Sequence, residues 1–112
     1  MYQRGDIVSV PFPFTDLTQT KLRPALVVSN KEVNKTGDVI LAMITSVEKT
    51  EVMSMAINSE DVTQPLPKDS FVRCHKLVTI SQSLILKTIS TAKPNFVENV
   101  ADRIRLLIGE EQ

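Results

Sequence analysis

The chain has 112 residues, of which 42% are apolar and 23% are charged, and its 13 basic side chains balance 13 acidic ones. This composition is typical of one globular domain with a single core, here residues 1–112, and excludes wholesale disorder. The zero net charge disfavours a non-specific duplex binder, and the sequence has neither a signal-peptide run nor the ~20 continuous apolar residues of a membrane span, which predicts a cytoplasmic protein.

Two strands joined by a polar connection are predicted at the N-terminal end. Residues 6–14 alternate apolar and small side chains until Pro11 and Pro13 end their pairing, which indicates an edge strand or one that breaks into a loop. Residues 15–22 are polar and show no periodicity, so we expect a mobile connection there. The aliphatic run at 23–29 then predicts a buried strand.

The middle of the chain predicts further strands at short intervals. Turn-forming residues occupy 30–37, and the longest apolar stretch, residues 38–46, is typical of a central strand. Residues 52–57 alternate as a fourth strand, and residues 59–69, with two prolines, indicate a loop. Three short strands are expected after it, at residues 70–74, 77–81 and 84–90. Short strands at regular spacing favour a small barrel.

A different periodicity marks the C-terminal segment, where apolar residues recur at intervals of three and four, as on one face of a helix. These residues are Val97, Val100, Ala101, Ile104, Leu107 and Ile108. Pro94 near the start and Gly109 just past the end are typical helix boundaries, and Arg103 and Arg105 complement the helix dipole. The predicted fold is therefore mainly β, a small barrel on which one C-terminal α-helix packs its apolar stripe.

Cysteine, histidine and glycine usage limits the chemistry. Cys74 and His75 are the only residues of their types, so the sequence predicts no internal disulfide and no tetrahedral zinc site made from Cys and His. It contains no phosphate-binding glycine loop and no nucleophile elbow. We therefore expect chemistry without a metal or cofactor. If nucleic acid is the partner, we expect local recognition of a single-stranded segment in a groove.

Four pieces of the sequence, in order and spacing, resemble the MazF/PemK toxins. They are R-G-D-I-V at 4–8, R-P-A-L-V-V-S at 23–29, I-T-S at 44–46 and V-R-C-H-K-L-V-T-I at 72–80. The match extends over nearly the whole chain, and P-F-P-F-T-D at 11–16 resembles the PemK-like branch. The resemblance implies an SH3-like barrel that forms a homodimer, cuts single-stranded mRNA at short motifs and is held inactive by a cognate antitoxin protein.

RNA supplies its own nucleophile, so an enzyme of this type has to deprotonate a 2′-hydroxyl, stabilise charge on phosphorus and protonate the departing 5′-oxygen. A guanidinium suits the second role because its planar fork binds two phosphate oxygens. Arg23 matches the family's R-P arginine near the RNA phosphate, and Arg73 matches a family position that resembles a catalytic arginine. The alternative for each is an exposed surface arginine.

His75 and Thr45 complete the set of candidate catalytic residues. His75 lies two residues after Arg73, so on a regular strand both side chains face one side. It stands where relatives usually have Asp or Glu; an imidazole can serve as general acid or base, but the exchange can equally mean lost activity. The resemblance implies that Thr45 contacts the scissile phosphate and donates to an oxyanion. The alternative is a threonine that closes a strand through a turn bond.

The resemblance also implies residues that contact RNA without catalysing its cleavage. These candidates are Phe14, Thr15, Asp16, Lys21, Pro24, Ser46 and Lys76. Asp16 and Lys21 belong to the connection expected to fold over the substrate, although charges in loops are usually only solvated. Lys76 matches a position often held by glutamine, so a contact from Lys76 to RNA is a variation on the family pattern.

Three functions fit the sequence. The first is a metal-independent endoribonuclease that uses Arg23, Thr45, Arg73 and His75 and leaves a 2′,3′-cyclic phosphate and a 5′-hydroxyl. The second is a barrel that kept the fold, lost the carboxylate at position 75, and binds RNA or an antitoxin peptide without cleavage. The third is a structural dimer whose groove only receives an antitoxin-like peptide.

Overall fold

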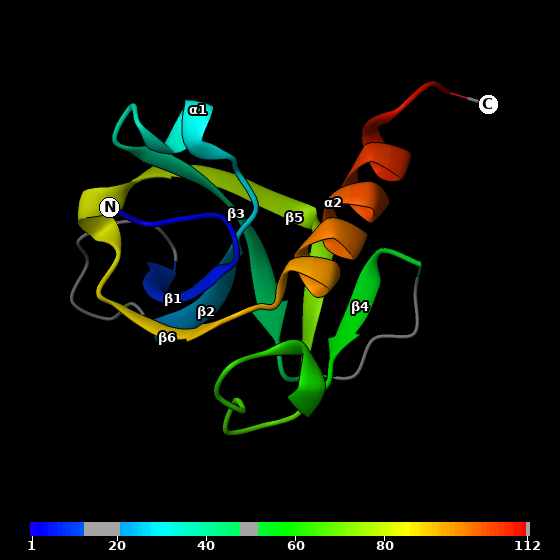
Figure 1. The fold of residues 1–112 in the computed structure, drawn as a ribbon, viewed down its shortest axis with the longest axis horizontal. Helices are drawn as coiled ribbons and strands as arrows, with labels where there is room; N and C mark the ends of the chain where they lie inside the picture. Colours follow the sequence, from blue (N-terminus) through cyan, green and yellow to red (C-terminus); the bar gives the residue numbers. More distant parts are fainter. Residues whose placement is uncertain (13–20, 48–51, 112) are drawn as a thin grey trace.

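Six antiparallel strands form one curved sheet in the computed structural model, which describes residues 1–12, 21–47 and 52–111. The strand order is β4-β5-β3-β2-β1-β6, and the sheet curls into a half-barrel beside the C-terminal helix α2 (Figure 1). The strands are β1 Asp6–Phe12, β2 Lys21–Val27, β3 Asp38–Thr45, β4 Ser54–Ile57, β5 Ser70–Ser81 and β6 Lys87–Thr91. The predicted fold, mainly β with a small barrel and one C-terminal α-helix, is confirmed.

Both faces of the sheet are buried, and each face contributes to its own apolar cluster. On β2, Leu26 belongs to the cluster beside α2, whereas Ala25 belongs to the cluster on the opposite face. On β3, Ala42 and Leu41 divide in the same way. This two-sided burial explains why residues 38–46 form a continuous apolar run instead of an alternating one. The strand is central, as predicted, because it lies between β2 and β5.

The sequence prediction that β1 could be an edge strand is wrong, because β1 pairs with β2 on one side and with β6 on the other. Pairing with β6 ends at Ser9, so Pro11 lies where β1 has only β2 as a neighbour. A proline, which has no N–H to donate, is best tolerated at such a place. Lys21 and Leu22 belong to β2 instead of the predicted connection, whose residues 15–20 lie outside the described residues.

Short helical turns lie in segments that the sequence predicts to be turn, loop or strand. The helix α1 (Lys31–Asn34) lies within the predicted turn at 30–37, and Asn30 caps it by accepting a hydrogen bond from the backbone N of Glu32 at 3.0 Å. Single 3₁₀ turns lie at Ser59–Asp61 and Gln82–Leu84. These elements are too short to produce a periodic sequence signal.

The two short strands predicted at 70–74 and 77–81 are one strand, β5, of 12 residues. The register between β5 and β3 shifts at residues 73–76, between the two predicted strands. The break that the sequence pattern predicted between residues 74 and 77 is therefore wrong, and a shift in register lies there instead. The strand continues, and the alternation of its side chains is interrupted instead.

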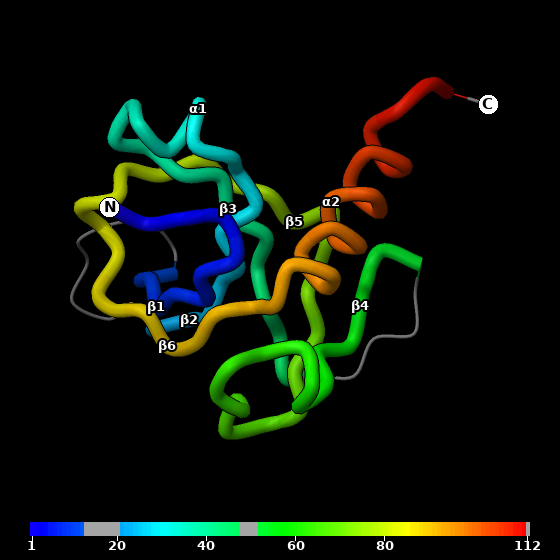
Figure 2. Tube along the Cα trace, viewed as in Figure 1, coloured from blue at the N-terminus to red at the C-terminus, as the bar shows by residue number. Residues whose placement is uncertain are grey.

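The helix α2 (Pro94–Ile108) begins and ends where the sequence predicts, with Pro94 as its first residue and Gly109 directly after its last. Phe96 and Val97 are buried against the sheet, whereas Ile108, expected on the packed stripe, is 73% exposed. In Figure 2 the chain runs out along α2 to the C-terminus, away from the curved sheet. Within residues 1–12, 21–47 and 52–111, no helix has the length and apolarity that crossing a membrane requires.

Gly5 connects the start of β1 to two other parts of the chain. Its N donates to the carbonyl of Val27 at 2.9 Å, and its own carbonyl accepts from the N of Ala92 at 2.7 Å. The φ angle of Gly5 is 101°, a region that side-chain-bearing residues rarely adopt, and a Cβ here would lie 3.2 Å from the Ala92 carbonyl oxygen. The position therefore requires glycine for two independent reasons.

Candidate active site

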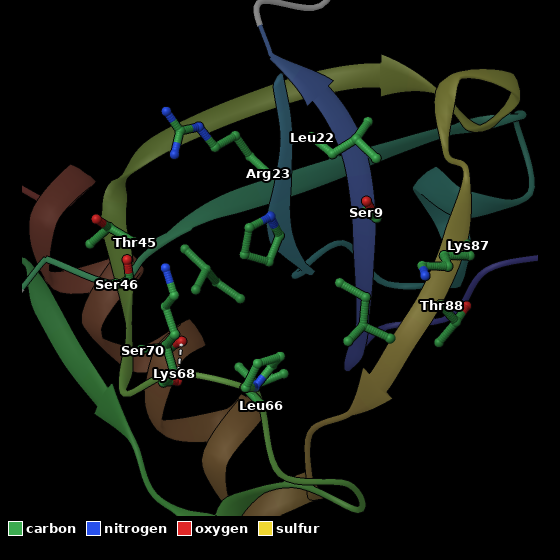
Figure 3. Close-up of a pocket in the computed structure, with 14 residues that line it drawn as sticks. Ser9, Leu22, Arg23, Thr45, Ser46, Leu66, Lys68, Ser70, Lys87 and Thr88 are labelled. Carbon is green, nitrogen blue, oxygen red and sulfur yellow. Dashed lines mark hydrogen bonds between the residues drawn. The ribbon is translucent and has the colours of Figure 1, made fainter. Parts of the chain in front are cut away.

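Two cavities adjoin at the end of the sheet where β2 begins and β3 ends. The first, called the large cavity here, has a volume of about 540 Å³. It is lined by Ser9, Leu22, Arg23, Pro24, Ile44, Thr45, Ser46, Leu66, Pro67, Lys68, Ser70, Lys87, Thr88 and Ile89 (Figure 3). The second, called the arginine hollow, has a volume of about 310 Å³. It is lined by Phe12, Arg23, Met43, Ile44, Thr45, Val47, Arg73 and Lys76.

Arg23 and Thr45 line both cavities, from neighbouring strands. Ala25 of β2 pairs with Met43 of β3, so the same antiparallel register, carried two residues further, sets Arg23 opposite Thr45. Residues two apart on a strand share a face, so Arg23 and Thr45 continue the face of Ala25 and Met43 past the paired region. The guanidinium and the hydroxyl are therefore brought to the boundary between the two cavities by sheet pairing.

The hydroxyl of Thr45 takes part in the turn that ends β3. Its Oγ1 accepts a hydrogen bond from the backbone N of Val47 at 3.1 Å. The turn bond considered in the sequence analysis is thus present, but it does not exclude a chemical role. A hydroxyl that accepts one bond still has its own proton to donate, and the turn bond fixes the oxygen from which that proton is donated.

Arg73 and Lys76 line the arginine hollow from the irregular part of β5. Val72 pairs with Ile44 and Leu77 pairs with Ala42, so four residues of β5 lie opposite the single residue between those partners. On a regular strand, residues three apart face opposite sides. The shift in register is what lets Arg73 and Lys76 line one hollow.

All charges carried by the described lining residues of the arginine hollow are positive, from Arg23, Arg73 and Lys76. Arg73 is half-buried, and it lies opposite Ser54 in the register between β5 and β4. Arg23 and Lys76 are exposed. Two guanidiniums and an ammonium around one small hollow fit a phosphodiester, because guanidinium forks match phosphate oxygens and keep their charge at any working pH.

His75 is exposed and lines neither of the two cavities. It lies inside the shifted segment of β5 and, unlike Arg73, does not line the arginine hollow. Its neighbour Cys74 is buried in the cluster beside α2. Burial raises the pKa of the Cys74 thiol above its ordinary value, and the positive charge of Arg103 opposes this increase only in part.

The predicted RNA-contacting residues fall into different places. Pro24 and Ser46 line the large cavity and Lys76 lines the arginine hollow. Lys21 is exposed at the start of β2 and lines neither cavity. The remaining three, Phe14, Thr15 and Asp16, lie outside the described residues.

Some residues around the cavities were not singled out from the sequence. Phe12, Met43 and Val47 line the arginine hollow, and Lys68 and Lys87 line the large cavity. No local motif distinguishes these lysines, since one follows the prolines of a loop and the other starts the last strand. Among the described residues, no group of three or more His, Cys, Asp and Glu side chains is arranged to hold a metal ion.

A family model described as "PemK-like, MazF-like toxin of type II toxin-antitoxin system" matches residues 3–108. A comparison with curated proteins gave no match. An endoribonuclease from a mycobacterial species, solved in complex with its cognate antitoxin, is similar in structure with a TM-score of 0.81 and 18% identity, over 100% of this chain and 99% of the other.

Two further solved structures are similar over almost the full length. Mycobacterium tuberculosis toxin MazF-mt6 has a TM-score of 0.74 and 18% identity, over 96% of this chain and 99% of that one. A chain of the MazE-MazF crystal structure (Form-III) from Deinococcus radiodurans has a TM-score of 0.78 and 19% identity, over 98% of each chain. At these identities the structural similarity establishes the fold, and the family model establishes membership.

Proposed function

Because this chain belongs to the PemK/MazF toxin family of type II toxin-antitoxin systems, we propose that it is an endoribonuclease that cleaves single-stranded mRNA without a metal ion. The observation that supports this proposal is the convergence of Arg23, Thr45 and Arg73, from three strands, on one hollow of about 310 Å³. The solved relatives that are described as endoribonucleases add support from the fold.

In the proposed reaction, the 2′-oxygen of one ribose attacks the adjacent phosphorus and the bond from phosphorus to the 5′-oxygen breaks. The products are a 2′,3′-cyclic phosphate and a 5′-hydroxyl. Arg23 and Arg73 bind the non-bridging oxygens as negative charge builds on them, and Thr45 donates its hydroxyl proton as a hydrogen bond to the same group. Such donors accelerate a reaction because they are already in place when the charge develops.

His75 has the proposed role of exchanging a proton with the 2′-hydroxyl or with the departing 5′-oxygen. It lies in the same shifted segment as Arg73 and Lys76, both of which line the hollow. An exposed side chain changes rotamer readily, so the imidazole can turn toward bound RNA. Phe14, Thr15, Asp16, Lys21, Pro24, Ser46 and Lys76 are proposed to contact RNA.

The test is an in vitro digest of single-stranded RNA in the presence of a chelator, followed by sequencing of the fragment ends. Fragments with 2′,3′-cyclic phosphate and 5′-hydroxyl ends are expected, whereas 5′-phosphate ends or dependence on magnesium would contradict the proposal. The Arg73→Ala protein is the control for contaminating ribonuclease. Ends that both proteins produce equally do not come from this site.

A second candidate function is a barrel that binds RNA or an antitoxin peptide without cutting. The exposure of His75, away from both cavities, favours this candidate. Intact RNA after prolonged incubation, together with measurable binding, would identify it. In both cases we propose a cytoplasmic homodimer controlled by a cognate antitoxin. Relatives solved in complex with an antitoxin or with MazE support the control by an antitoxin.

A further inference from the structure

The large cavity carries chemistry that the proposed cleavage step does not use. It shares Arg23 and Thr45 with the arginine hollow, but Lys68 and Lys87 line only the large cavity. In Figure 3, Lys87 points from β6 into the cavity and Lys68 extends from the opposite side toward Ser46. The two ammonium groups therefore face a common space next to the proposed cleavage site.

Apolar side chains form much of the wall of this cavity. Pro24 comes from β2, Ile44 from β3, Leu66 from the loop before β5 and Ile89 from β6. Ile44 is buried, and Leu66 and Ile89 pack against the apolar cluster beside α2. The wall is thus backed by the core, and it offers a firm apolar surface of the kind on which a flat ring can lie.

The charges of the described lining residues are all positive here too, from Arg23, Lys68 and Lys87. Because the whole chain has equal numbers of basic and acidic residues, this gathering of cations is local and not a consequence of composition. An apolar wall between cations suits a ligand that is apolar in one part and anionic in another. Hydroxyls of Ser9, Ser70 and Thr88 in the same lining can exchange hydrogen bonds with polar ring edges.

We propose that the large cavity binds one nucleotide of the RNA strand, immediately beside the phosphodiester held in the arginine hollow. The base lies against the wall formed by Pro24, Ile44 and Leu66, and Lys68 and Lys87 contact the neighbouring phosphates. This proposal rests on RNA being the substrate, as argued under the proposed function. The volume of about 540 Å³ lies within the range of small-molecule sites, and the shared wall of Arg23 and Thr45 makes the two sites continuous along one strand.

The consequence is that Lys68 and Lys87 contribute to binding and that Leu66 influences which base is accepted next to the cut. A merely structural role for these residues would leave the salt dependence of RNA binding and the sequence cut unchanged. These two quantities therefore test the proposal directly.

The first experiment measures binding of a single-stranded RNA oligonucleotide to the full chain carrying Arg73→Ala, which is expected to slow cleavage ~10²–10³-fold during the measurement. Adding Lys68→Gln or Lys87→Gln is expected to weaken binding about fivefold to tenfold and to lower the slope of log affinity against log salt by about 0.7 each. Lys31→Gln is the matched control, because Lys31 is exposed on α1 and lines neither cavity. Lysine variants that behave like this control overturn the proposal.

The second experiment sequences the cleavage sites that the Leu66→Ala protein produces in RNA of mixed sequence. The shorter alanine side chain enlarges the cavity. We expect this change to relax the base preference at one position adjacent to the cut and to leave the other positions unchanged. An unchanged motif from a folded Leu66→Ala protein, checked by circular dichroism, overturns the proposed base site. Because Lys68 and Lys87 are exposed, their variants keep the test valid if Leu66→Ala fails to fold.

Failure of this proposal is distinguishable from failure of the proposed function. Cleavage with the expected ends, but with no effect of either lysine on binding, overturns the nucleotide site alone. If RNA binding depends on both lysines but the unmodified protein does not cleave RNA, the proposed ribonuclease activity is overturned and the proposed nucleotide site stands. Dependence on the lysines for an acidic peptide but not for RNA would assign the cavity to a protein partner and overturn the proposal.

Discussion

Arg23 and Arg73 line the same hollow although they come from β2 and β5, which are separated in the sheet by β3. A phosphate in this hollow would therefore be held from two sides by a rigid sheet and not by one flexible segment. Loss of either guanidinium leaves the other in place, so both single variants are expected to fold and to bind RNA weakly while losing most of their cleavage rate.

We predict that Arg73→Ala lowers the cleavage rate ~10²–10³-fold, because it removes a charged donor that is in place before the transition state forms. Single-turnover cleavage of a labelled RNA measures the effect, and circular dichroism checks the fold. Arg105→Ala is the control, since Arg105 is exposed on α2 and its ion pairs with Glu98 and Asp102 lie at the surface. Equal rates for the two variants would remove Arg73 from the mechanism.

Thr45→Ser and Thr45→Val separate the hydroxyl of Thr45 from its shape. Serine keeps both the acceptor for the Val47 N–H and the proton that can be donated, so its cleavage rate is expected to stay near that of the unmodified protein. Valine removes both, and we expect a loss of ~10²-fold. If valine slows cleavage no more than serine, the hydroxyl serves only the turn at the end of β3.

Substitution of His75 tests whether the imidazole moves protons. We expect His75→Ala to lower the cleavage rate by ~10²-fold or more, and His75→Asp to retain more activity than alanine, because a carboxylate can also act as a base. A His75→Ala protein that cleaves at the unmodified rate would mean that His75 takes no part.

Gly5→Ala and Gly37→Ala form a matched pair for stability. Both glycines have positive φ angles, 101° and 95°, so each substitution is expected to cost ~1–3 kcal/mol in backbone strain. A Cβ at Gly5 also meets the Ala92 carbonyl oxygen at 3.2 Å, whereas a Cβ at Gly37 has nothing within 4 Å among the described residues. Urea denaturation should therefore show a larger loss for Gly5→Ala. Equal losses would show that this contact relaxes freely.

The raised pKa of Cys74 predicts a loss of stability at alkaline pH. Above the ordinary thiol pKa, the unfolded chain releases its proton while the buried thiol keeps it, so the free energy of unfolding falls as pH rises. Below that pH, the thiol is protonated in both states and makes no difference. Urea denaturation at neutral and alkaline pH measures the fall, which should be smaller in Cys74→Ala.

Most of the fold could be predicted because its signals are local. The aliphatic runs at β2 and β3 and the change of period at Pro94 follow from which side chains are buried, and each was visible in the sequence. The neighbours of β1 were not visible, because strand order depends on pairing between distant segments. Proline in β1 predicted a strand with a neighbour on one side only. This is true only of the residues after Ser9, where pairing with β6 has ended.

The candidate site could be predicted in part for the same reason. Arg23, Thr45 and Arg73 were recognised by resemblance, and the structure brings them to one hollow. The register shift in β5 has no sequence signature, so the grouping of Arg73 with Lys76 could not be derived from alternation. Lys68 and Lys87 meet only because a loop and the last strand lie on two sides of one cavity.

Cys74 lies in the shifted segment of β5 and is 1% exposed. It packs in the same buried cluster as Phe96 and Val100 of α2. The backbone position of Arg73 is therefore supported by buried residues that line neither cavity. We expect a larger residue at a buried position of α2 to shift this segment of β5, so a substitution that lines neither cavity can change the position of Arg73.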